Sequence, residues 1–205
     1  MIIIKPSAQI ISNIDYDYII KLLERAGRTC YKSENKITEK SAEDFLKHII
    51  ANGHEAVLEH FSFTVKFVCD RGVSHETVRH RIASFCQEST RYCNYGKENQ
   101  IKVIEPMFFE KGTEEYKAWY RACCCAEESY LLLLQKGRTP QEARTVLPNS
   151  LATELVMTAN IREWRHFLKL RTSPAAHPQM VQIAKMLLNE CVSEMPVLFK
   201  DLKQQ

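Results

Sequence analysis

One segment, from Arg79 to Tyr92, constrains this chain more than any other: Arg-His-Arg-Ile-Ala-Ser-Phe-Cys-Gln-Glu-Ser-Thr-Arg-Tyr. It interleaves three arginines and several hydroxyl groups with apolar residues such as Ile82 and Phe85. A solvated basic helix face is the alternative, but such a face has no need of these apolar side chains. We therefore expect the segment to be partly buried, and buried guanidinium groups need anionic partners. Guanidinium forks and hydroxyls together suit the phosphate of a planar ligand such as a nucleotide.

The length and net charge of the chain exclude several classes of protein. The 205 residues are enough for one substantial domain, and 45% apolar with 26% charged residues is ordinary for a globular protein. The net charge of +3 is too small for a broad nucleic-acid-binding surface. No stretch approaches the ~20 apolar residues of a membrane span, and the start, Met1 to Pro6, lacks the features of a signal peptide. We expect a cytoplasmic protein that binds neither nucleic acid nor a membrane.

Cysteine and histidine spacings argue against a metal centre. The eight cysteines form no Cys-x-x-Cys pair, and Cys123, Cys124 and Cys125 are adjacent within a helical pattern, so their side chains point in different directions. The segment from His54 to His60 holds two histidines and two glutamates, but its spacing differs from the helical His-Glu-x-x-His arrangement. We expect no metal, reduced cysteines, and a polar loop beside a ligand pocket at 54–60.

Hydrophobic periodicity predicts the secondary structure. Gly27 is expected just after the end of a helix, and Ser74 is expected to cap another. Thr139, Pro140 and Glu142 form a capping pattern for a short helix that ends at Pro148. The expected helices are 15–27, 41–51, 74–83, 113–135, the one from Thr139, 160–170 and 178–194, and the expected strands are 1–6, 61–69, 101–104 and 151–158. These elements predict an α/β (α+β) fold, a single domain over 1–205 with long helices packed on a modest, mainly antiparallel sheet.

A second basic cluster lies in the segment from Asn160 to Arg171. Arg162, His166 and Lys169 recur at spacings of four and three, which places them on one helix face. On this pattern alone, the face is a surface stripe of an amphipathic helix, with Asn160 as its cap. Arg144, on the short helix before Pro148, is by itself only a solubilising residue.

Taken together, these segments resemble a known family. Arg79-His80-Arg81 followed by seven residues and Ser89 is similar to the Arg-His-Arg-x₇-Ser signature of the flavin-dependent thymidylate synthases. The segments His54 to His60, Ala143 to Pro148, Asn160 to Arg171 and Ala176 to Gln179 resemble further elements of that family, in the correct order. The matching segments extend over about residues 25 to 190.

The resemblance implies an activity and its cofactors. The family methylates deoxyuridine monophosphate (dUMP) to thymidine monophosphate (dTMP), with methylenetetrahydrofolate as carbon donor and NADPH-reduced FAD as hydride source. It also implies a homotetramer in which each site is built from several subunits. The rival from another class is a nucleotide- or RNA-binding module that uses the same arginines, but it would carry a larger basic excess.

The resemblance also implies roles for individual residues. Arg171 is expected to be catalytic, because the matching arginine favours ionisation at N3 of the uracil. The implied FAD contacts are Ala56, by its backbone only, with Arg79, His80, Arg81, Gln87, Asn160, Arg162 and His166. The implied dUMP contacts are Glu76, Arg79, Gln87, Glu88, Ser89, Thr90, Arg91, Arg144 and Arg171.

Two assignments stay open at this point. Ser89 closes the signature and could be a nucleophile, but a serine needs an adjacent base and none is evident nearby, so ligand positioning is favoured. The family pattern after Ser84 has Asn-Glu where this chain has Cys86 and Gln87, with Glu88 next. Either Gln87 or Glu88 then faces the ligand.

Overall fold

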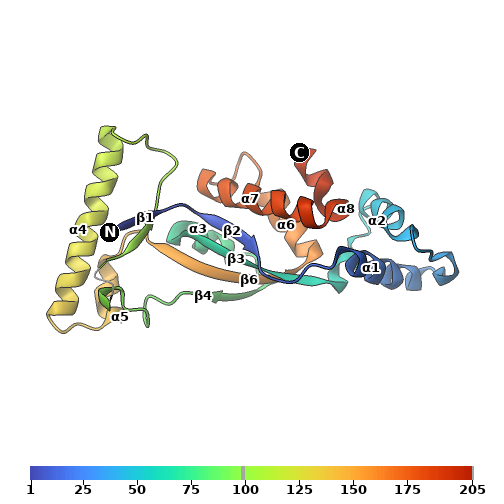
Figure 1. The fold of residues 1–205 in the computed structure, drawn as a ribbon, viewed down its shortest axis with the longest axis horizontal. Helices are drawn as coiled ribbons and strands as arrows, with labels where there is room; N and C mark the ends of the chain where they lie inside the picture. Colours follow the sequence, from blue (N-terminus) through green and yellow to red (C-terminus); the bar gives the residue numbers. More distant parts are fainter. Residues whose placement is uncertain (98–99, 205) are drawn as a thin grey trace. The chain divides into compact units, whose positions relative to one another are not determined.

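The structure, a computed structural model, describes residues 1–97 and 100–204. Its strands form a four-stranded sheet of order β2-β3-β6-β4 and a parallel pair of β1 with β5 (Figure 1). The strands are β1 (Ile2–Ile4), β2 (Ser7–Ile10), β3 (Ser62–Asp70), β4 (Ser84–Gln87), β5 (Lys102–Ile104) and β6 (Ala152–Asn160). The chain is thus a mixed α/β protein with a small, mainly antiparallel sheet, as the sequence predicts.

Eight α-helices accompany these strands in the described residues, joined by short 3₁₀ turns. The helices are α1 (Tyr16–Cys30), α2 (Ser41–Ala51), α3 (Arg71–Thr77), α4 (Glu114–Gln135), α5 (Pro140–Ala143), α6 (Ile161–Arg171), α7 (Pro178–Glu194) and α8 (Pro196–Phe199). The turns are η1 (Glu34–Lys36), η2 (Glu55–His60), η3 (Tyr95–Lys97), η4 (Arg144–Val146) and η5 (Lys200–Gln204). None of the helices in the described part of the chain is long and apolar enough to cross a membrane.

The contacts divide the chain into two compact units, which we describe separately. Unit 1 comprises 1–7, 67–79 and 86–155, and unit 2 comprises 8–66, 80–85 and 156 onward. The expectation that 1–205 forms one functional domain stays a prediction.

Each unit has its own buried apolar centre. In unit 1, Ile101, Val103, Cys123 and Leu151 form a buried cluster. In unit 2, the rings of Phe63 and Trp164 stack with centroids 5.2 Å apart, and the Trp164 indole N–H donates to the Phe63 carbonyl oxygen at 3.1 Å. This pair fixes α6 against β3, because the indole buries its large apolar surface and still satisfies its donor.

Several helix ends lie where the sequence predicts them. α2 covers 41–51 as expected, and Thr113 caps α4. Thr139 and Glu142 form the capping box of α5. Asn160 caps α6, since its side chain accepts a hydrogen bond from the Glu163 backbone N–H at 2.9 Å.

The expected helix from Ser74 to Ala83 is wrong at both ends. α3 begins after Asp70, whose carboxylate accepts from the Val73 backbone N–H at 2.8 Å. Ser74 is buried inside the helix, and its hydroxyl donates to the Arg71 carbonyl oxygen. The helix ends at Thr77, and Ser84–Gln87 pairs into the sheet as β4. Asp70, at the end of β3, takes the capping position, and the Ser74 hydroxyl is bonded within the helix instead.

Gly27 does not end its helix. α1 continues to Cys30, and Gly27 is buried within it. A Cβ at Gly27 would lie 2.6 Å from Cζ of Phe45 on α2. The glycine therefore serves the close approach of two helices rather than a turn.

Some apolar residues are less buried than expected. Ile82 is 71% exposed, and Leu170, expected on the apolar side of α6, is 48% exposed. Phe85 is half-buried. In the cysteine triplet, Cys123 is buried, Cys124 is intermediate and Cys125 is exposed, so the three side chains do point in different directions.

Candidate functional site

The predicted site residues fall into two groups, one in each unit. Unit 1 holds Glu76, Arg79, Gln87, Glu88, Ser89, Thr90, Arg91 and Arg144. Unit 2 holds Ala56, His80, Arg81, Asn160, Arg162, His166 and Arg171.

A cavity of about 300 Å³ in unit 1 gathers positive charge and a hydroxyl group. Arg71, Thr90 and Arg144 line it, together with His75. None of the described residues that line it is acidic. Two guanidinium groups and a hydroxyl without a competing carboxylate are a donor set for a phosphate dianion.

Local structure places these side chains. Arg144 directly follows α5, and the capping box of Thr139 and Glu142 fixes the start of that helix. The Nη1 atom of Arg144 lies 3.4 Å from the hydroxyl of Thr90, which is buried. Arg71 opens α3, and its backbone N–H donates to the Asn149 carbonyl oxygen at 3.0 Å. Both arginines thus lie at the ends of short helices.

Arg71 and His75 were not predicted as site residues. They lie four residues apart on α3, so they share one helix face. That spacing was available in the sequence, but the helix was expected to begin only at Ser74. The misplaced helix start therefore hid the pair.

The residues after β4 are bound to one another within unit 1. The Gln87 amide donates to the hydroxyls of Ser74 at 2.9 Å and Thr153 at 3.3 Å. The Glu88 carboxylate accepts from the Tyr95 hydroxyl at 2.7 Å, and burial together with this contact raises the pKa of Tyr95. Both Gln87 and Glu88 have internal partners, so the choice between them as ligand contact stays open.

The signature serine lies in a turn. Its Oγ accepts from the Arg91 backbone N–H at 3.3 Å, and Arg91 Nε donates to Gln141 at 3.1 Å. Arg79 is exposed just beyond α3, and Glu76 is half-buried on that helix. No hydrogen bond between Ser89 and a basic side chain is present among the described residues, which favours the positioning role.

A second cavity, of about 400 Å³, lies in unit 2. Three predicted cofactor residues line it, namely Asn160, Arg162 and His166. Arg162 Nη1 contacts Glu59 at 2.5 Å, and its Nε lies 3.8 Å from Glu55. The wall is therefore mixed in charge, with the exposed side chain of Ile82 as its apolar part.

These residues fit a planar anionic cofactor. Exposed Ile82 offers an apolar surface for a ring, and Arg162 and His166 offer donors beside it. Arg162 keeps donors beyond those facing Glu55 and Glu59, since a guanidinium carries five N–H groups. Ala56 and Arg81 are exposed in the same unit.

His80 and Arg171 are linked in unit 2. Arg171 Nε donates to His80 Nε2 at 3.1 Å, while His80 Nδ1 lies 3.1 Å from the Glu163 carboxylate. Burial lowers the pKa of His80, and the neighbouring charge of Arg171 adds to this effect against the opposing contact with Glu163. In the sequence, Glu163 is recognisable only as part of a capping pair with Asn160.

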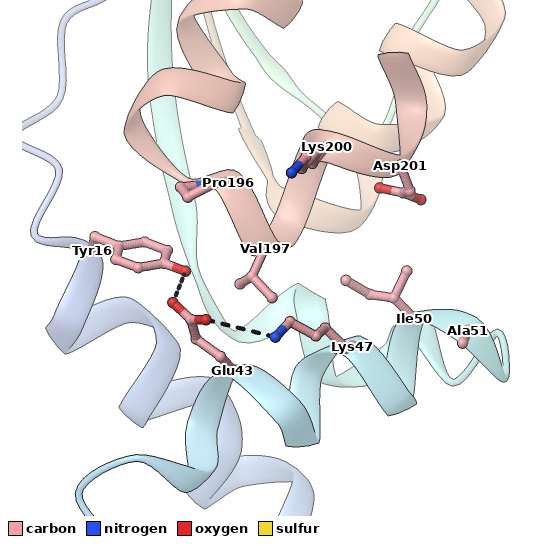
Figure 2. A pocket seen from close by; sticks show the side chains of 9 residues that line it. All are labelled: Tyr16, Glu43, Lys47, Ile50, Ala51, Pro196, Val197, Lys200 and Asp201. Atoms are coloured by element: carbon pink, nitrogen blue, oxygen red, sulfur yellow. Dashed lines mark hydrogen bonds and ion pairs between the residues drawn. The ribbon is translucent and has the colours of Figure 1, made fainter. Parts of the chain in front are cut away.

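Another cavity of unit 2 contains none of the predicted site residues (Figure 2). It measures about 580 Å³ and lies between α2 and the segment that begins with α8. The Tyr16 hydroxyl donates to Glu43 at 2.8 Å, and burial together with this contact raises the pKa of Tyr16 to about 12. Lys47 contacts the same carboxylate at 3.8 Å.

Comparison with known proteins gives a consistent result. The family described as thymidylate synthase complementing protein matches residues 14–197. The chain is 36% identical over 198 residues to the flavin-dependent thymidylate synthase of Corynebacterium aurimucosum, covering 88% of this chain and 78% of that protein. It is 33% identical over 171 residues to the enzyme of the same name from Pyrococcus furiosus, covering 82% and 70%.

A solved structure shares the fold. The UMP/dUMP methylase PolB from Streptomyces cacaoi, bound with 5-Br dUMP, superposes with a TM-score of 0.82 at 23% identity. The match covers 100% of this chain and 97% of that one. At this identity the likeness speaks for the fold alone.

Proposed function

The chain belongs to the flavin-dependent thymidylate synthase family, and from that premise we propose that it methylates dUMP reductively to dTMP. The observation that carries the proposal is the acid-free cavity of unit 1, lined by Arg71, Arg144 and Thr90. Its charge suits the phosphate of a nucleoside monophosphate. The alternative of an RNA- or nucleotide-binding module that does no chemistry is not favoured by this family membership.

Unit 1 supplies the groups for the nucleotide. Arg71 and Arg144 would hold the phosphate dianion, with the Thr90 hydroxyl as a neutral donor. Arg91 and Arg79 are exposed and add positive charge for an incoming anion. Ser89 would orient the ligand through its hydroxyl rather than attack it, because no base is hydrogen-bonded to it in the described chain. The remaining expected contacts are Glu76, Gln87 and Glu88.

Unit 2 supplies the groups for the cofactor. Arg162, His166 and the amide nitrogen of Asn160 would hold FAD at their cavity, where Ile82 offers an apolar surface. The other expected cofactor contacts are Ala56, His80 and Arg81 in this unit, and Arg79 and Gln87 in unit 1. When bound, FAD carries the hydride chemistry with NADPH as reductant, and methylenetetrahydrofolate donates the carbon.

Arg171 is the residue to which we assign catalysis. A guanidinium beside the uracil favours the negative charge that develops at N3 on ionisation. One well-placed donor of this kind contributes about 3–4 kcal/mol to transition-state stabilisation. Within unit 2, the Nε–H of Arg171 donates to His80 Nε2 at 3.1 Å, which holds the guanidinium in place.

The wider context is also part of the proposal. We expect a homotetramer in the cytoplasm, with sites shared between subunits and no nucleic-acid partner. The 23.8 kDa chain should then elute with about four times that mass in light-scattering chromatography.

Release of tritium from dUMP labelled at C5 tests the function. The purified protein should release tritium with methylenetetrahydrofolate, NADPH and FAD, and should not do so when FAD is removed. Arg171→Ala should lower the rate on the order of a hundredfold or more while FAD binding, read from its visible absorbance, is retained. Unchanged turnover in Arg171→Ala, or no FAD-dependent release by the wild type, would contradict the proposal.

A further inference from the structure

Three side chains of unit 2 form a continuous hydrogen-bonded row. The Glu163 carboxylate lies 3.1 Å from His80 Nδ1, and His80 Nε2 lies 3.1 Å from Arg171 Nε. His80 is 5% and Glu163 8% exposed, so water competes little for either contact. The row ends at the arginine to which we assign catalysis.

The hydrogen-bonding chemistry of arginine fixes the protonation state of His80. A guanidinium has only donors, so His80 Nε2 must present its lone pair to Arg171. In a neutral imidazole the other nitrogen then carries the proton, and His80 Nδ1–H faces the Glu163 carboxylate, which accepts it. A protonated His80 would set an N–H against an N–H and one cation against another. The row is therefore consistent only with the neutral Nδ1–H form.

Glu163 is itself held in place. It is the third residue of α6, and its backbone N–H donates to the Asn160 side chain at 2.9 Å. A glutamate at this position usually turns back to the N-cap backbone, but here its carboxylate contacts His80.

The His80 ring is also confined. It packs edge-on against Phe167, with centroids 4.9 Å apart, and against His166 at 5.7 Å. The charged and titratable side chains facing it in unit 2 are Glu163, Arg171 and His166. Burial lowers the pKa of His80, in accord with a neutral ring.

From this geometry we propose that Glu163 is a positioning residue, which holds His80 in the Nδ1–H tautomer so that His80 Nε2 fixes the orientation of the Arg171 guanidinium. The inference rests on the proposed function for its kinetic consequence only. The tautomer itself is a property of the chain and can be measured without turnover.

The same residues could be taken for a metal site. His80, Glu163 and His166 offer ligand atoms that all lie within 4.8 Å of one another. A metal bound at His80 Nε2 would displace Arg171, and a metal bound at Nδ1 would leave the ring proton on Nε2, facing the Arg171 N–H. Metal binding and the contact with Arg171 therefore exclude each other.

Nitrogen NMR of the ¹⁵N-histidine-labelled full-length protein tests the tautomer. His80→Gln assigns the His80 signals among the seven histidines. In the wild type, Nδ1 should show the shift of a protonated nitrogen and Nε2 that of an unprotonated one. A wild-type protein with the proton on Nε2, or one whose His80 signals move when one equivalent of Zn²⁺ is added, would overturn the proposal.

Substitutions at position 163 test the consequence. Glu163→Ala should lose the Nδ1–H form and lower kcat on the order of ten- to a hundredfold, with the KM for dUMP little changed, because the guanidinium is misdirected rather than removed. Glu163→Gln keeps an acceptor oxygen for Nδ1–H and should retain the tautomer and most of the activity. Unchanged tautomer and kcat in Glu163→Ala would overturn the proposal.

The controls separate this inference from folding and from the function. Glu43→Ala removes a carboxylate elsewhere in unit 2, at the cavity of Figure 2, and should leave both the His80 shifts and kcat unchanged. If Glu163→Ala does not fold, the wild-type spectrum and Glu163→Gln still decide the matter. A wild type with the Nδ1–H form but no tritium release would refute the proposed function and leave the tautomer standing.

Discussion

Arg71 and Arg144 carry the positive charge of the acid-free cavity, and only one of them was expected there. Arg144 belongs to a segment that resembles the family, whereas Arg71 lies outside every such segment. The structure places both on one cavity with the hydroxyl of Thr90. At the scale of single residues, the phosphate is thus the part of the proposed ligand that can be tested most directly.

We predict that Arg71→Ala and Arg144→Ala each weaken dUMP binding about tenfold or more, since a hydrogen bond to a charged group contributes about 1.5–3 kcal/mol. Affinity for deoxyuridine, which has no phosphate, should change little. Titration calorimetry with both ligands measures this, and Arg121→Ala on α4, which does not line this cavity, is the control. Equal losses for dUMP and deoxyuridine would place the phosphate elsewhere.

The lowered pKa of His80 predicts how the stability of the fold depends on pH. Its pKa is lowered from 6.5, chiefly by burial, so the unfolded chain takes up the proton more readily than the folded one. The contribution of uncharged His80 to the free energy of unfolding is therefore complete above about pH 6.5. It is lost as the pH falls towards the pKa that His80 has in the folded chain. Between pH 7.5 and 5.5, the melting temperature of the wild type should fall more steeply than that of His80→Gln.

Thermal unfolding across this pH range provides the measurement. His48→Gln, which removes an exposed histidine of α2, should run parallel to the wild type and serves as the control. Parallel curves for wild type and His80→Gln would show that His80 titrates alike in the folded and unfolded chain.

At the scale of elements, α3 depends on its cap. Asp70 is 6% exposed, and its carboxylate accepts from the Val73 backbone N–H at 2.8 Å. The helix carries Arg71 and His75 into the cavity, so the cap also supports the site. We predict that Asp70→Ala lowers the free energy of unfolding by about 1–2 kcal/mol, because the cap is lost.

Asp70→Asn is the matched control, since asparagine caps helices about as well as aspartate. Asp70→Asn should keep most of the wild-type stability and most of the wild-type affinity for dUMP. Denaturant unfolding and calorimetry on the two variants check this. Equal stability of Asp70→Ala and the wild type would mean that the cap contributes nothing here.

Element by element, the sequence predicts periodic segments well and irregular ones poorly. α2 and α4 have strong apolar periodicity and clear ends, and both occur where expected. α3 and β4 are short, so their sequences carry too few repeats to separate helix from strand. Their bounds depend on pairing in the sheet and on the Asp70 cap, neither of which periodicity reports.

At the scale of the whole molecule, the proposed sharing of sites between subunits has a direct consequence. At a dUMP concentration well below the KM, Arg144→Ala should keep about a tenth or less of wild-type activity, and Arg171→Ala about a hundredth or less. If a site takes these two arginines from different subunits, tetramers reassembled from an equal mixture should recover about one quarter of wild-type activity, since both arginines are then intact in that share of sites.

Refolding the two variants together and assaying tritium release measures this. Each variant refolded with itself is the control and should keep only its own low activity. No recovery in mixtures shown by mass spectrometry to contain both chains would mean that one subunit supplies both arginines.

The sequence by itself determined the family and most of the long elements. Ordered motifs such as Arg79 to Ser89 and Asn160 to Arg171 are local strings, and helix periodicity and caps are local physical signals. Only the tertiary structure decided that Arg71 joins Arg144, that Ile82 is exposed, and that the Glu163 carboxylate turns to His80. These contacts and exposures involve residues far apart in the chain. They depend on which surfaces are buried together, and no local sequence pattern encodes that.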